Sequence, residues 1–109
     1  GDDADDTIVA DVLETITIGT QPANQTTSSG AATFTVAATV DQSGTITYQW
    51  QKKTAAGTRY VNVSGATSAS LALTGQLAAN DGDKYRVKIN TSKGAEEVVS
   101  DAATLTFGS

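Results

Sequence analysis

The sequence predicts an all-β sandwich of seven to eight antiparallel strands with no disulfide. Three observations support this prediction. Short runs rich in Thr, Val, Ile and Ala alternate between apolar and polar residues, which is the period of a half-buried strand. Gly, Asn, Asp and Ser gather between these runs, where turns are expected. The chain contains no cysteine, so packing alone must hold the two sheets together.

A tryptophan and a distant tyrosine indicate the topology of the sandwich. In immunoglobulin domains a Trp on strand C packs against a disulfide, and a corner Tyr stands two residues before the second Cys. Trp50 and Tyr85 fit these places, and Val87 stands where the second Cys would be. Val36, fourteen residues before Trp50, is the candidate for the first position. The sequence therefore predicts an immunoglobulin-like β-sandwich.

Five residues are expected to have structural roles in this fold: Val36, Trp50, Asp81, Tyr85 and Val87. Trp50 should lie in the core with the two valines. The hydroxyl of Tyr85 should bond the backbone at the corner before its strand. Asp81 should cap that corner or pair with a nearby base such as Arg59.

The first two strands are expected on either side of a polar segment. Residues 13–19 alternate as a strand, and Pro22 then breaks the ladder because it has no N–H to donate. We expect a loop over 24–30 and a second strand over 31–40. The core positions of the second strand are its apolar even-numbered residues Phe34, Val36, Ala38 and Val40.

Three further strands are expected in the middle of the chain, over 45–52, 58–63 and 68–73. Their apolar residues recur at every second position, as for strands with one buried face. The positions expected to face the core are Ile46, Tyr48, Trp50, Leu71 and Leu73. Leu77 follows these strands and is expected to close one end of the core.

The last two strands are expected over 84–90 and 95–107, joined by a hairpin. Tyr85, Val87 and Ile89 should face the core. The final strand is interrupted near Ser100, which predicts a β-bulge that reverses its two faces. No segment has a long period of 3.6 residues, so no sizeable helix is expected.

The acidic residues are unevenly distributed. The formal net charge is −5, and the first eleven residues hold five acids and no base. Residues 12–109 therefore hold seven acids and seven bases. We expect 1–11 to be an acidic flexible linker and 12–109 to be the domain. Calcium binding by the linker carboxylates stays open as an alternative.

The composition disfavours several classes of function. The chain has neither His nor Cys, so the usual general base and thiolate are lacking. It has no Gly-rich phosphate motif and no apolar run of membrane-spanning length. The domain also lacks the net basic footprint that generic nucleic-acid binding requires. We expect no enzymatic activity, no cofactor, no metal site in the domain, no nucleic-acid partner and no membrane insertion.

A row of bases is the main indication of a binding function. On the strand expected over 84–90, three successive outward-facing positions are all bases, namely Lys84, Arg86 and Lys88. The candidate binding residues are Lys53, Arg59, Tyr60, Lys84, Arg86 and Lys88. Two interpretations stay open. In the first, the row binds anionic glycans, hydroxyl-rich glycans or an acidic patch on a protein. In the second, it is a solvated face whose charges prevent aggregation.

The chain resembles the immunoglobulin-like domains of tailed-phage virion proteins and bacterial surface proteins. Four stretches carry the resemblance, namely 48–52, 63–67, Asp81 with 85–87, and 100–105. It extends over about 16–107. The missing cysteine pair is a departure from the animal immunoglobulin pattern.

The resemblance implies a non-catalytic module on a phage virion structural protein, such as a capsid decoration or tail protein. Such a module would adhere weakly to cell-surface or mucus glycans, or decorate the capsid or tail. Its partners would be those glycans, other virion proteins or neighbouring domains, and its location the virion surface. The alternative is a spacer domain of a bacterial adhesin or multidomain secreted protein, on the cell surface or outside the cell.

Overall fold

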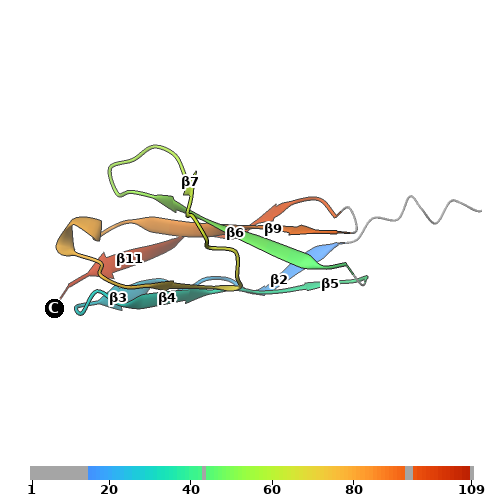
Figure 1. Ribbon diagram of the computed structural model, residues 1–109, viewed down its shortest axis with the longest axis horizontal. Coiled ribbons are helices and arrows are strands. Elements are labelled where there is room, and N and C mark those ends of the chain that lie inside the picture. The colour runs from blue at the N-terminus through green and yellow to red at the C-terminus, as the bar shows by residue number, and fades with distance from the viewer. Residues whose placement is uncertain (1–14, 43, 93–94, 109) are drawn as a thin grey trace, which may run out of the picture.

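A computed structural model describes residues 15–42, 44–92 and 95–108. The described chain forms two facing layers of β-strands and a single short 3-10 turn, η2 (Ala78–Asn80) (Figure 1). The strands are β2 (Ile16–Thr20), β3 (Gln25–Thr27), β4 (Ala32–Thr35), β5 (Ala37–Val40), β6 (Ile46–Lys53), β7 (Val61–Asn62), β8 (Ser70–Leu73), β9 (Lys84–Thr91), β10 (Val98–Val99) and β11 (Ala103–Phe107). The predicted linker over 1–11, with its calcium alternative, lies outside the described residues.

The larger layer has the strand order β3-β11-β9-β6-β7, and β10 also pairs with β9. β6 and β9 form an antiparallel ladder from the pair Ile46↔Thr91 to the pair Lys53↔Lys84. The predicted strands over 45–52 and 84–90 are therefore neighbours, as in immunoglobulin domains. This ladder is the frame of the candidate site.

The smaller layer consists of the pairs β2-β5 and β4-β8. The strand expected over 31–40 is divided at Val36 into β4 and β5, which pair with different neighbours. The Val36 N–H donates to the carbonyl of Ala69 at 3.0 Å, so the backbone bonding continues through the division. Val36 itself is buried.

The predicted loop over 24–30 is wrong, because it contains β3, which pairs in parallel with β11. The chain thus leaves β2 in the smaller layer and joins the larger layer after the buried Pro22. Two side-chain amides fix this crossing. The oxygen of Gln21 accepts from the Asp101 N–H at 2.9 Å, and the oxygen of Asn24 accepts from the Thr104 N–H at 2.8 Å.

The predicted bulge in the last strand is confirmed by the pairing register. Val98 pairs with Ile89, whereas Ala103 pairs with Tyr85, so one extra residue separates the two ladders. Val98 and Ala103 both pack on the core although one position is even and the other odd. Ser100 fixes the bulge: its N–H donates to the Val87 carbonyl and its hydroxyl accepts from the Val87 N–H, both at 2.9 Å.

Two other predictions need correction. Of the strand expected over 58–63, only β7 pairs with β6 in a ladder, although the Val63 N–H also donates to the Trp50 carbonyl at 2.9 Å. Leu77 does not close the core; it is 66% exposed beside η2.

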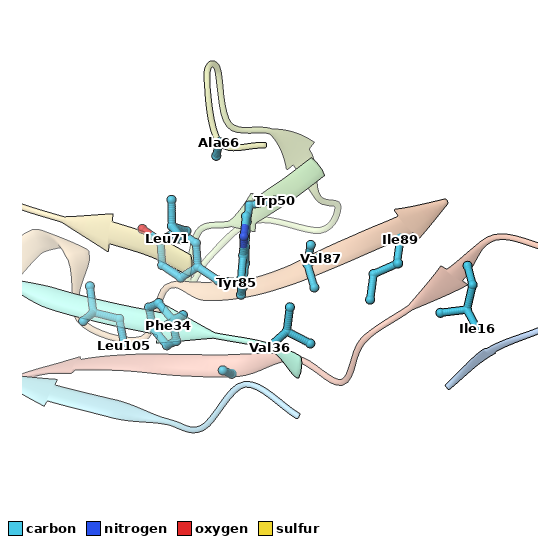
Figure 2. Packing of buried hydrophobic residues seen from close by; sticks show 11 residues of the cluster. Ile16, Phe34, Val36, Trp50, Ala66, Leu71, Tyr85, Val87, Ile89 and Leu105 are labelled. Atoms are coloured by element: carbon cyan, nitrogen blue, oxygen red, sulfur yellow. The ribbon is translucent and has the colours of Figure 1, made fainter. Parts of the chain in front are cut away.

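The core lies between the two layers (Figure 2). Its buried apolar residues are Ile16, Phe34, Val36, Trp50, Ala66, Leu71, Tyr85, Val87, Ile89, Ala103 and Leu105. Figure 2 shows Trp50 between Tyr85 and Val87, with Val36 reaching toward them from the other layer. The indole Nε1 donates to the Ser68 carbonyl at 2.7 Å, which satisfies its polar atom. Buried valines and the indole thus occupy the region where immunoglobulin domains place a disulfide.

Candidate binding face

Beyond the pair Thr47↔Asn90, three cross-strand pairs place six longer polar side chains on the outer surface of the β6–β9 ladder. Because side chains alternate along a strand, these pairs share the face opposite to Trp50 and Val87. The pairs are Gln49↔Lys88, Gln51↔Arg86 and Lys53↔Lys84. We call these six residues the cationic face. The structure thus brings together four of the six predicted binding residues.

Arg86 is held in place from two sides. Its Nε donates to Oε1 of Gln51 at 2.9 Å, and Nε2 of Gln51 donates to Oδ1 of Asn62 at 2.9 Å. The guanidinium carbon lies 4.0 Å from the centre of the Tyr60 ring, a cation–π arrangement. Tyr60 therefore joins the cationic face through Arg86. The sequence did not indicate that Gln51 and Asn62 hold Arg86 in place, because these side chains meet only in the folded domain.

The two ends of the cationic face differ in charge. At one end Lys53 and Lys84 stand opposite each other, and among the described residues no carboxylate pairs with either. The Lys53 ammonium donates to the Gly57 carbonyl, and that of Lys84 donates to the Thr104 hydroxyl, both at 3.1 Å. At the other end Lys88 lies 3.6 Å from a carboxylate oxygen of Glu97. The positive charge is therefore concentrated at the Lys53 end.

The last of the predicted binding residues, Arg59, lies apart from the cationic face. Arg59 is exposed in the segment between β6 and β7, and no contact with a described residue ties it to the cationic face. Gln49 belongs to the cationic face, but its side-chain amide is hydrogen-bonded within the domain. Its Nε2 donates to the carbonyls of Trp50 at 3.0 Å and Val63 at 2.9 Å. These bonds fix the segment after β7 against β6.

An ion pair between a buried carboxylate and a partly exposed ammonium lies on the inner side of the same ladder. The carboxylate of Asp83 is 3.3 Å from the ammonium of Lys52 and also accepts from the Ala55 N–H at 3.3 Å and the Asn80 side chain at 3.1 Å. Asp83 is 1% exposed. We did not predict this pair, although alternation from Trp50 and Tyr85 places both residues on the inner face. All of these contacts are within the domain, so the ion pair of Asp83 with Lys52 stabilises the fold and is not part of the cationic face.

Asp81 and Tyr85 differ from expectation in their contacts. Oδ1 of Asp81 accepts from the Phe107 N–H at 2.9 Å, so it anchors β11 and does not pair with Arg59. Within the described part of the chain, the Tyr85 hydroxyl has no hydrogen-bond partner at the corner; its ring packs on Phe34 with centroids 5.0 Å apart. Burial, with a smaller contribution from the Asp83 carboxylate, raises the pKa of Tyr85 from 10.0 to about 12.

The described residues offer few alternatives to the cationic face. A groove of about 280 Å³ lies beside β8, but residues 63–68 and 70–73 that line it are uncharged. No group of three or more His, Cys, Asp or Glu residues in the described chain is arranged to hold a metal ion. No helix within the described ranges is long and apolar enough to cross a membrane.

The fold has relatives among solved structures. One is described as Sidekick-1 immunoglobulin domains 1-5, with a TM-score of 0.61 and 16% identity over 84% of this chain and 19% of that chain. Another is a mutant complex of titin M10 with an obscurin-like 1 Ig domain, with a TM-score of 0.53 and 18% identity over 85% of this chain and 92% of that chain. The chain thus spans far less than two thirds of the Sidekick-1 structure.

The comparison with curated proteins finds no match. A family model described as a domain of unknown function (DUF8696) matches residues 17–109. This match covers all the described strands except the first residue of β2. The chain therefore belongs to the DUF8696 family of domains of unknown function, and its fold is an immunoglobulin-like β-sandwich.

Proposed function

We propose that this domain is a non-catalytic adhesion module that binds cell-surface glycans weakly through the cationic face. The observation that carries the proposal is the ordered row of Lys84, Arg86 and Lys88, with Arg86 fixed by Gln51 and Tyr60. Cations and amides on a sheet surface donate hydrogen bonds, which glycan hydroxyl and carboxylate oxygens accept. Because an ordered Arg loses little conformational entropy on binding, this arrangement favours recognition.

A flat sheet face suits weak binding that is strengthened by copy number. The cationic face is the outer surface of a ladder, so a bound glycan would keep much of its hydration. Single contacts of this kind are weak, and display in many copies raises the overall affinity by 10²–10⁴-fold. Together with the resemblance to domains of tailed-phage virion proteins, this supports placing the module on a virion structural protein, as a capsid or tail decoration.

The acidic residues support a non-catalytic role because their contacts are structural. Asp83 is buried with Lys52, and Asp81 accepts from the backbone of β11. Oδ1 of Asp41 accepts from the Thr15 N–H at 2.8 Å. Glu97 pairs with Lys88 and accepts from the Asn90 side chain at 2.9 Å. None of these carboxylates is paired with another, as general acid–base catalysis by two carboxylates would require.

One observation favours a second function, that of a spacer. Each base of the cationic face already has an internal partner, namely Gly57, Thr104, Gln51 or Glu97. Such contacts also suit a solvated sheet face that resists aggregation through its charges. In that case the domain would separate neighbouring domains of a bacterial adhesin or secreted protein.

Binding of multivalent domain to intact bacteria, mucus and their purified polysaccharides tests the proposal. The comparison variant changes Lys53, Lys84, Arg86 and Lys88 to Gln, which removes four charges and keeps polar side chains. A matched control places two new amides on the exposed outer side of the smaller layer, by Thr33→Gln and Thr39→Gln. We expect the first variant to lose binding and the control to keep it. Equal binding by all three proteins would exclude the cationic face as the binding surface, and no binding by the natural protein would favour the spacer.

A further inference from the structure

We propose that the ligand of the cationic face is an acidic polysaccharide, and that its carboxylate or sulfate groups bind at the end formed by Lys53, Lys84 and Arg86. This inference rests on the proposed function and names its ligand class. Lys53 and Lys84 are directly opposite each other in the ladder. Like charges in this position destabilise a sheet, and no described carboxylate offsets them. An anionic ligand would supply the missing charge.

Arg86 extends the pair to a group of three cations. It stands two residues along β9 from Lys84, a distance of about 7 Å on the same face. Its described hydrogen bond uses Nε alone, whereas a guanidinium carries five N–H donors. The terminal nitrogens are therefore available for a bidentate bond to a carboxylate or sulfate. Stacking on Tyr60 at 4.0 Å orders the guanidinium before the ligand arrives.

The opposite end of the face is chemically different. Glu97 neutralises Lys88 at 3.6 Å and also accepts from Asn90. An anion at this end would have to compete with a carboxylate already in place. Lys88 therefore contributes less than Lys84 to binding an anion, although both lysines lie on the same strand and face.

A sparse polyanion suits this site better than a nucleic acid does. Three unneutralised cations form a small patch on a chain whose formal net charge is −5. Nucleic-acid binding depends on many phosphate contacts over a broad basic surface. An acidic polysaccharide has widely spaced charges separated by hydroxyl groups, so a local patch can bind one or two of them without long-range attraction.

The test measures binding of multivalent domain to polygalacturonate, chondroitin sulfate, neutral dextran and duplex DNA at several salt concentrations. The variants are Lys53→Gln with Lys84→Gln, Arg86→Lys, and Lys88→Gln. The control is Thr33→Gln with Thr39→Gln, on the exposed outer side of the smaller layer. We expect the double variant to lose about tenfold in affinity for the acidic polysaccharides, in line with two charged contacts. Arg86→Lys should lose bidentate binding, Lys88→Gln should lose less affinity than the double variant, and the control should change affinity less than about twofold. The salt dependence should correspond to about two to three released ions.

Three results would overturn the inference. Neutral dextran bound as tightly as the acidic polysaccharides would exclude an acidic ligand while leaving adhesion through the face in place. Duplex DNA bound as tightly would indicate general attraction of polyanions. A domain that binds bacteria in the experiment above but binds neither acidic polysaccharide would overturn this inference and leave adhesion in place. Thermal unfolding of each variant checks that these exposed changes leave the fold intact.

Discussion

Trp50 illustrates how single residues hold this domain together without a disulfide. Its indole is fully buried, and Val87 lies beside it in the ladder. Alternation along two strands sufficed to predict the burial of both residues. The ion pair of Asp83 with Lys52 was not predicted, because a sequence pattern of apolar residues does not show where a charge on the inner face will find its partner.

Replacing Trp50 by Ala should destabilise the domain by about 3–5 kcal/mol, because it leaves a large cavity and an unpaired Ser68 carbonyl. Denaturant unfolding followed by far-UV circular dichroism measures the change. Trp50→Phe is the matched variant and should cost less, since it retains most of the buried ring. A cooperative transition of unchanged midpoint for Trp50→Ala would contradict the placement of this residue in the core.

Replacing Asp83 by Ala should cost about 1–3 kcal/mol, because the Ala55 N–H and the Asn80 side chain lose their acceptor and the partly exposed Lys52 ammonium loses its counter-ion. Lys52→Met should cost less, because Asp83 keeps its two N–H donors. Urea unfolding of both variants gives the comparison. A smaller loss for Asp83→Ala than for Lys52→Met would show that the ion pair is not organised as described.

Tyr85 should make the domain sensitive to alkaline pH. Its folded pKa of about 12 lies above the unfolded value of 10.0, so the native state holds its proton more tightly. The stability from this group is therefore complete below pH 10 and decreases as the pH rises toward about 12. Unfolding measured across this window should show a smaller loss for Tyr85→Phe than for Tyr48→Phe, which keeps Tyr85. Identical losses in the two variants would contradict this assignment.

At the scale of elements, the paired strands of the larger layer were the most predictable. β6, β9 and the bulge before β11 follow from alternating apolar residues and from the polar interruption near Ser100. β3 was not predictable, because its pairing depends on Asn24 and Gln21 bonding to the backbone of residues 80 positions away. The three residues of β3 are all polar, so they show no alternation of apolar and polar positions. Their partner strand, β11, comes close only in the folded domain.

The bulge offers a prediction at this scale. Ser100→Ala removes the hydroxyl that accepts from the buried Val87 N–H, which then has no acceptor. We expect a loss of about 1–3 kcal/mol in the free energy of unfolding. Thr106→Ala, on the exposed side of β11, is the control and should change stability by less than about 0.5 kcal/mol. Hydrogen exchange at the Val87 amide should accelerate in the first variant only.

At the scale of the whole molecule, the two layers differ in charge. The bases of the described chain lie on β6, on β9 and in the segment between β6 and β7, whereas β2, β4, β5 and β8 contain no charged residue. The sequence predicted the row of bases but not which of them a carboxylate neutralises. That division depends on Glu97, which directly precedes β10 and lies beside Lys88. The difference between the layers gives the molecule one polar, cationic side.

Mapping of amide chemical shifts by NMR, during titration with oligogalacturonate, tests binding through the cationic face most directly. Because the outer side of the ladder is compact, the affected amides should cluster. We predict saturable shifts at Lys53, Tyr60, Lys84, Arg86 and Thr104, with little change on β2, β4, β5 and β8. Shifts centred on the smaller layer or on the groove beside β8, or no shift at any amide, would contradict binding through the cationic face.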